Sequence, residues 1–126
     1  GIIETLVAHL SVAKVDAIVI EVADGLLQCE TAALLDSRVF AKTVDSIIFA
    51  AGDAMGAAAG VECLQRKNLP IAAVSGRLTA SPLAIIETGK ITGMPVLDKA
   101  ALSSQTIAEV LQISPQMSGM RNAAAR

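Results

Sequence analysis

The fold of this chain is constrained most by short apolar runs that lack polar alternation. These runs are DAIVIEV at residues 16–22, DSIIFAA at residues 45–51 and IAAVSG at residues 71–76. A strand with one face in water alternates apolar and polar residues, whereas a strand covered on both faces, as in a parallel sheet, is apolar throughout. The runs therefore predict three buried parallel strands, and MPVLD at residues 94–98 predicts a short fourth strand.

Segments with helical periodicity separate the apolar runs. The predicted helices cover residues 2–11, 30–43, 54–68, 80–93 and 103–112. The strongest start signal is Ser81 as an N-cap followed by Pro82 at the first helical position. Thr106 with Glu109 is a weaker match to a capping box, and it marks the start of the last helix.

Strands that alternate with helices predict an α/β fold. We expect three layers, with a mostly parallel sheet of about four strands and helices on both faces, a Rossmann-like arrangement joined by right-handed crossovers. Residues 1–112 then form a single α/β domain, or the C-terminal part of a larger domain. Residues 113–126 carry no core pattern, which predicts a flexible tail.

The composition excludes several classes of protein. Hydrophobic residues make up 53% of the chain, which excludes disorder, and no apolar run approaches the roughly 20 residues that span a bilayer. Two aromatic residues and a net charge of −2 make nucleic acid a poor partner. Cys29 and Cys63 form no CxxC pattern, which indicates a reduced, cytoplasmic setting. Because Gly1 stands inside a helical pattern, we expect an excised or processed product with sequence missing upstream.

Two carboxylates follow the first predicted strand. Ligands of open parallel sheets bind at the carboxyl ends of the strands, which here directs attention to residues 21–28, 52–56 and 75–81. Glu21 has the chemistry to hold Mg²⁺ beside a phosphate, and Gly25 after Asp24 would allow a sharp turn. Alternatively, Glu21 meets solvent, as polar residues at strand ends often do, or caps a neighbouring helix.

Two further segments of the predicted ligand edge also have two interpretations each. Gly52, Gly56 and Gly60 either receive an anion at a helix N-terminus or allow close packing, and packing is favoured because neither GxxxxGKS/T nor GxGxxG is present. Arg77, on the loop after the third strand, either binds a phosphate or carboxylate through its planar fork or is a solvated arginine beside a helix cap.

Three segments, taken in order, resemble dethiobiotin synthetases and cobyric-acid-synthase-like enzymes. They are IVIEVADGLLQ at residues 18–28, DSIIFAAGDAMGAAAGVECLQRKNLPIAAVSG at residues 45–76 and TGMPVLD at residues 92–98. The order is also similar to the C-terminal part of the DUF1611-like proteins, which carry a P-loop-type domain. The resemblance covers roughly residues 15–98 and implies the C-terminal half of a P-loop NTPase domain.

The resemblance implies roles for particular residues. Glu21 corresponds to an Mg²⁺-site residue near the phosphates of ATP, and Asp24, Gly25 and Gln28 would lie in the substrate or phosphate loop. The segment that begins with Ser75, Gly76 and Arg77 would border the nucleotide or substrate, which makes these three residues cofactor-binding candidates. The chain departs from the family in two places: it has no Walker A motif, and no Asn follows IAAVSG, where the family often uses one to recognise adenine.

The sequence is compatible with two functions. The chain is either the C-terminal portion of a nucleotide-dependent, Mg²⁺-dependent ligase-like enzyme or NTPase, inactive by itself, or a non-catalytic α/β module that binds a small anion or dimerises. In both cases the expected partner is a small molecule or nucleotide. A sheet that lacks a central strand would expose apolar surface, which predicts a homo-oligomer such as a homodimer.

Overall fold

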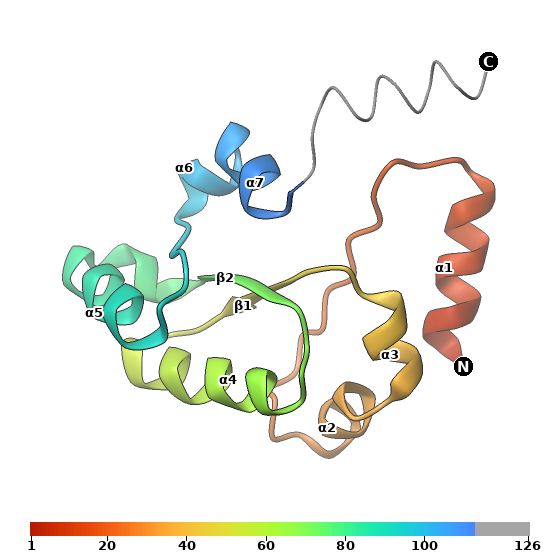
Figure 1. Ribbon diagram of the computed structural model, residues 1–126, viewed down its shortest axis with the longest axis horizontal. Helices are drawn as coiled ribbons and strands as arrows, with labels where there is room; N and C mark the ends of the chain where they lie inside the picture. The colour runs from red at the N-terminus through yellow and green to blue at the C-terminus, as the bar shows by residue number, and fades with distance from the viewer. Residues whose placement is uncertain (113–126) are drawn as a thin grey trace. The chain divides into compact units, whose positions relative to one another are not determined.

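The computed structural model describes residues 1–112 and divides the chain into two units, Gly1–Asp45 and Ser46–Arg126 (Figure 1). Each unit has its own helices, and the parallel strands belong to the second unit. Residues 113–126, for which the sequence predicts a flexible tail, lie outside the described residues.

The N-terminal unit contains three helices, which are α1 (Ile2–Val12), α2 (Cys29–Leu35) and α3 (Arg38–Thr43). The prediction of one continuous helix over residues 30–43 is wrong, because the helix ends after Leu35 and a new one begins at Arg38. Ser37 has an extended backbone, and its hydroxyl accepts a hydrogen bond from the Phe40 N–H at 3.4 Å. Serine competes well for such cap positions, and here it divides the apolar pattern into two short helices.

The predicted strand over residues 16–22 is absent from the structure. The segment has no regular secondary structure, as Figure 1 shows between α1 and α2, and Val19 is 94% exposed. A β-branched run becomes a strand only where a neighbour pairs with its backbone groups, and within residues 1–112 this segment joins no sheet. Its apolar side chains therefore contribute little to a core.

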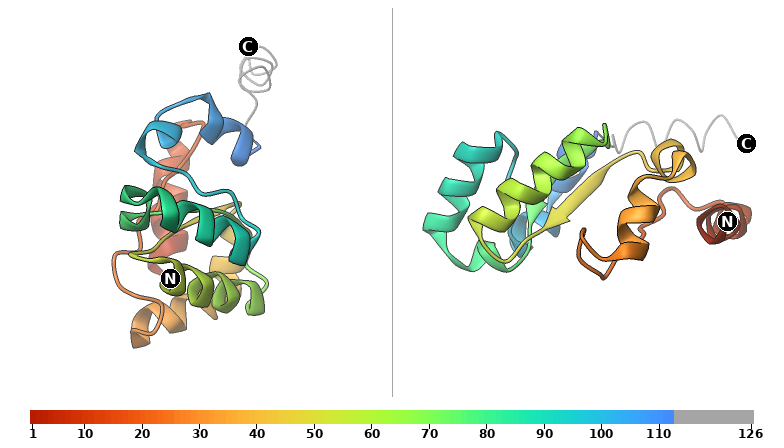
Figure 2. Two further views of the ribbon diagram at one scale, coloured as in Figure 1. Left: turned by 90° about the vertical axis from the view of Figure 1, so that its left-hand side faces the viewer. Right: turned by 90° about the horizontal axis from the view of Figure 1, so that it is seen from below.

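The C-terminal unit begins with β1 (Ile47–Ala50), α4 (Ala54–Arg66) and β2 (Ile71–Ser75). The two strands are parallel, with an irregular register between Ile47 and Ile48, and they confirm the second and third predicted strands. The Asp53 carboxylate starts α4 by accepting a hydrogen bond from the Gly56 N–H at 2.7 Å. Figure 2 shows α4 running beside the strands, with α5 next to it.

The remaining elements are the 3₁₀ helix η1 (Arg77–Ala80) and the helices α5 (Pro82–Thr92), α6 (Lys99–Leu102) and α7 (Gln105–Val110). The sequence predicts the start of α5 correctly: Ser81 is the N-cap, and Pro82 is the first helical residue. Gly93 ends α5 in the left-handed conformation, with φ +68°. The closing helix predicted over residues 103–112 is present in shorter form as α7, which is capped by Ser104, and the short helix α6 before it was not predicted.

The prediction of a three-layer sheet of about four strands is also wrong. The described part of the chain has one sheet of two strands, and the segment 94–98 contributes only an isolated parallel bridge between Val96 and Val74. Pro95 has no N–H to donate, and its carbonyl instead accepts from the Val74 N–H at 2.9 Å. The result is a βαβ unit with a third segment lying along β2.

The core of the C-terminal unit lies between α4 and the strands. Ala57, Val61, Val74 and Leu78 form its buried cluster. Gly60 is fully enclosed here, since a Cβ atom at this position would lie 2.1 Å from the Phe49 ring. The packing interpretation of the glycine series is therefore confirmed for Gly60, where the missing side chain lets the helix approach β1.

The enclosed position of Gly60 predicts opposite effects for two glycine-to-alanine substitutions in helices. Gly60→Ala is expected to lower the free energy of unfolding by about 1–3 kcal/mol, because the Phe49 ring must move. Gly89→Ala in α5 has room, since its Cβ would meet only Val96 at 4.0 Å, and should raise it by about 0.5–1 kcal/mol. Urea unfolding of both variants checks this, and equal effects would contradict the packing.

A second prediction concerns Thr88 in α5, which is fully buried and whose hydroxyl has no hydrogen-bond partner within residues 1–112. Thr88→Val removes the unsatisfied hydroxyl while keeping the shape of the side chain, so the unfolding free energy should rise by about 1 kcal/mol. The control is Thr92→Val in the same helix, where the hydroxyl donates to the Thr88 carbonyl and accepts from the Met94 N–H. That substitution should destabilise the protein, and a destabilised Thr88→Val would contradict the assignment.

Candidate functional site

The carboxyl ends of β1 and β2 are joined by backbone hydrogen bonds. The Ala51 N–H donates to the Ser75 carbonyl at 2.9 Å, and the Leu78 N–H donates to the Ala51 carbonyl at 3.1 Å. The backbone groups of Ala51 are therefore bonded to the last residue of β2 and to the turn that follows it. This edge of the sheet is the position at which parallel α/β units bind ligands.

Gly76 stands where the chain turns away from β2. Its φ of +101° and ψ of −165° belong to a region that is essentially restricted to glycine. A Cβ atom at this position would lie 2.6 Å from both the backbone nitrogen and the backbone oxygen of Ala51. The turn therefore requires glycine for two separate reasons, its conformation and its close approach to β1.

Ser75 ties a third segment to the same edge. Its side chain is buried, and its hydroxyl donates to the Leu97 carbonyl at 2.6 Å. The Leu97 N–H donates to the Val74 carbonyl at 2.8 Å. The segment before α6 is thus held along β2 by both backbone and side-chain bonds, and Ser75 acts as a structural link rather than as an exposed ligand group.

Three charged side chains lie on the segments that leave this edge. Asp53 and Asp98 are the N-caps of α4 and α6, and each carboxylate accepts a backbone N–H, from Gly56 at 2.7 Å and from Ala101 at 2.8 Å. Arg77 is exposed and forms no ion pair with any residue in the range 1–112. Of the three, Arg77 is the group available to an anion.

The other predicted site residues belong to the N-terminal unit. Glu21, Asp24 and Gly25 are exposed and lie outside the helices, and nothing lies within 4 Å of a Cβ built on Gly25. Gln28 has a structural role that its sequence pattern did not reveal, since its side-chain oxygen caps α2 by accepting from the Thr31 N–H at 2.8 Å. The predicted site residues are therefore divided between the two units.

Mg²⁺ coordination by Glu21 stays a prediction. The strand end that was expected to deliver this carboxylate is not formed, and residues 1–112 contain no group of three or more His, Cys, Asp or Glu side chains suited to a metal. Mg²⁺ beside a nucleotide needs only one or two protein carboxylates, because phosphates and waters complete its octahedron. The donor chemistry of Glu21 fits such an ion.

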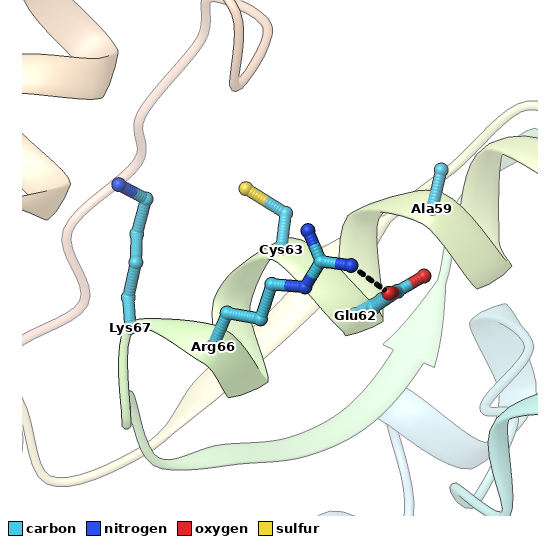
Figure 3. A pocket seen from close by; sticks show the side chains of 5 residues that line it. All are labelled: Ala59, Glu62, Cys63, Arg66 and Lys67. Atoms are coloured by element: carbon cyan, nitrogen blue, oxygen red, sulfur yellow. Dashed lines mark hydrogen bonds and ion pairs between the residues drawn. The ribbon is translucent and has the colours of Figure 1, made fainter.

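A depression of about 470 Å³ lies on α4, away from the helix start that adjoins the carboxyl edge (Figure 3). It is lined by Ala59, Glu62, Cys63, Arg66 and Lys67. The Arg66 guanidinium forms an ion pair with Glu62 one helical turn earlier, as the dashed line in Figure 3 marks. This ion pair is exposed and contributes little to stability.

Comparison of the chain with models of known families, with curated proteins and with solved structures finds no match. Within residues 1–112, no helix has the length and apolarity needed to cross a membrane.

Proposed function

We propose that this chain is the C-terminal portion of a nucleotide-dependent protein, either an NTPase or an ATP-dependent ligase-like enzyme of the cytoplasm. In this proposal, the carboxyl edge of β1 and β2 borders the phosphates of ATP or another nucleoside triphosphate. The observation that carries it is the fixed turn after β2. This turn carries Arg77, which forms no ion pair within residues 1–112, at the edge where parallel α/β units bind ligands.

The identity of the ligand rests on the resemblance of three ordered segments to the P-loop enzymes described above. On that basis, Glu21 holds Mg²⁺, while Asp24, Gly25 and Gln28 border the substrate or phosphates. For Glu21 the support is the resemblance alone, because the strand that would place it is absent. For Arg77 the support includes the geometry of the turn, whose backbone is held by Gly76.

The chain by itself is expected to bind nucleotide without hydrolysing it. Phosphoryl transfer depends on a backbone cradle and a lysine that neutralise the transferred phosphate. The sequence contains no GxxxxGKS/T motif that would supply them. Catalysis in this proposal therefore needs a phosphate-binding segment beyond these residues.

A second candidate function is a non-catalytic module that binds a small anion or pairs with a second copy of itself. The observation that favours it is the apolar surface of α5, where Leu83, Ile86 and Ile91 are between 54% and 63% exposed. Exposed aliphatic side chains on one helix are common at interaction surfaces. Arg77 would serve anion binding in this module as well.

Isothermal titration of the chain with a non-hydrolysable ATP analogue, with and without Mg²⁺, tests the proposal. We expect weak binding that strengthens when Mg²⁺ is present, and Glu21→Gln should abolish the Mg²⁺-dependent part because the amide is a poorer ligand than a carboxylate. The matched control is Asp16→Asn, which removes an equal charge from an exposed position in the same segment and should leave binding unchanged.

Three outcomes separate the alternatives. Equal heats for the unmodified chain and Glu21→Gln would contradict the magnesium assignment. Binding of the analogue without any dependence on Mg²⁺ would favour the anion-binding module. Absence of binding, together with a dimer in sedimentation equilibrium, would favour the self-associating module and overturn the nucleotide proposal.

A further inference from the structure

The turn after β2 is held on both sides of Arg77. Before it, Gly76 is pressed against the backbone of Ala51, and its carbonyl accepts from the Thr79 N–H at 3.0 Å and from the Thr79 hydroxyl at 2.8 Å. After it, Leu78 is 2% exposed, belongs to the core cluster and donates its N–H to the Ala51 carbonyl. The backbone of Arg77 is therefore fixed, although its side chain is exposed.

A fixed backbone matters for binding through a long side chain. Binding costs conformational entropy when it orders a flexible segment. This cost is smaller for a cationic side chain whose backbone is already ordered. Arginine presents its N–H donors in a planar fork that matches the oxygens of a phosphate. Backbone conformations restricted to glycine also concentrate at ligand sites, where the surrounding structure holds them in place.

We infer that Arg77 is the group that contacts a phosphate-type oxyanion at this edge, and that Gly76 is a positioning residue that acts through Arg77 without touching the ligand. This inference rests on the proposed function, which it deepens by naming the residue that contacts the phosphate and the residue that positions it. The Asp53 and Asp98 carboxylates on neighbouring segments carry negative charge, so the affinity for a bare oxyanion is modest and depends on salt.

The test is titration of the whole chain with inorganic pyrophosphate at low ionic strength in the absence of Mg²⁺. We expect measurable binding that falls about tenfold or more in Arg77→Gln, since the charge-assisted bonds are lost. Arg77→Lys should recover part of the affinity, because it keeps the charge but not the planar fork. Both changes are at an exposed position, so we expect the fold to stay intact.

The role of Gly76 is tested by comparing two glycines that both have positive φ. Gly76→Ala should weaken pyrophosphate binding to a similar extent, because the Cβ atom would collide with Ala51 and displace the turn. Gly93→Ala is the matched control: its φ is +68°, its Cβ would meet nothing within 4 Å, and binding should stay within twofold of the unmodified chain.

A double substitution distinguishes positioning from a general structural effect. If Gly76 acts through Arg77, Gly76→Ala should weaken binding no further when Arg77→Gln is already present. An additional loss of equal size in the double variant would overturn the positioning role. If Gly76→Ala does not fold, Ser75→Ala takes its place, because it removes the hydroxyl bond to Leu97 that holds the residue directly before Gly76.

The contact role of Arg77 has its own contradicting results. Absence of pyrophosphate binding, or an affinity within twofold of the unmodified chain in Arg77→Gln, would overturn it. The nucleotide proposal fails separately: pyrophosphate binding that depends on Arg77, together with no effect of Mg²⁺ on binding of the ATP analogue, would support this inference and count against the proposed nucleotide function.

Discussion

The contact between Gly76 and the backbone of Ala51 is the constraint on which the rest of the C-terminal unit depends. It allows the Leu78 N–H to reach the Ala51 carbonyl at 3.1 Å, and it brings Leu78 into the core with Val61 and Val74. Any larger side chain at position 76 would separate the strand ends. Because residue 76 lacks a Cβ atom, the end of β1 can contact the turn after β2, and this turn leads directly into α5.

Signals from neighbouring residues in the sequence predict correctly those helices and strands that form through contacts between residues close in the chain. Ser81 and Pro82 mark the start of α5, and the runs over residues 45–51 and 71–76 become neighbouring strands separated by one helix. The run over residues 16–22 has an equally strong strand pattern but no partner within the described chain, because pairing depends on contacts distant in sequence. Sequence alone cannot tell these two situations apart.

In the candidate site, too, some features could be predicted from the sequence and others could not. Arg77 could be identified from its loop, because a cation after a buried parallel strand falls at the ligand edge. The fixing of that loop could not be identified, because it depends on backbone atoms of Ala51 and on the Leu97 carbonyl, which leave no side-chain signal. For Glu21 the reverse holds: the residue type is suggestive, but the strand that would place it is missing.

The most direct test of the central constraint is amide hydrogen exchange, followed residue by residue by NMR. If the turn after β2 is fixed on β1, the Ala51 and Leu78 amides should exchange at least about 100-fold more slowly than in an unstructured peptide, as slowly as the Val74 amide in the core. Unprotected exchange at Ala51 and Leu78, with Val74 still protected, would contradict the account.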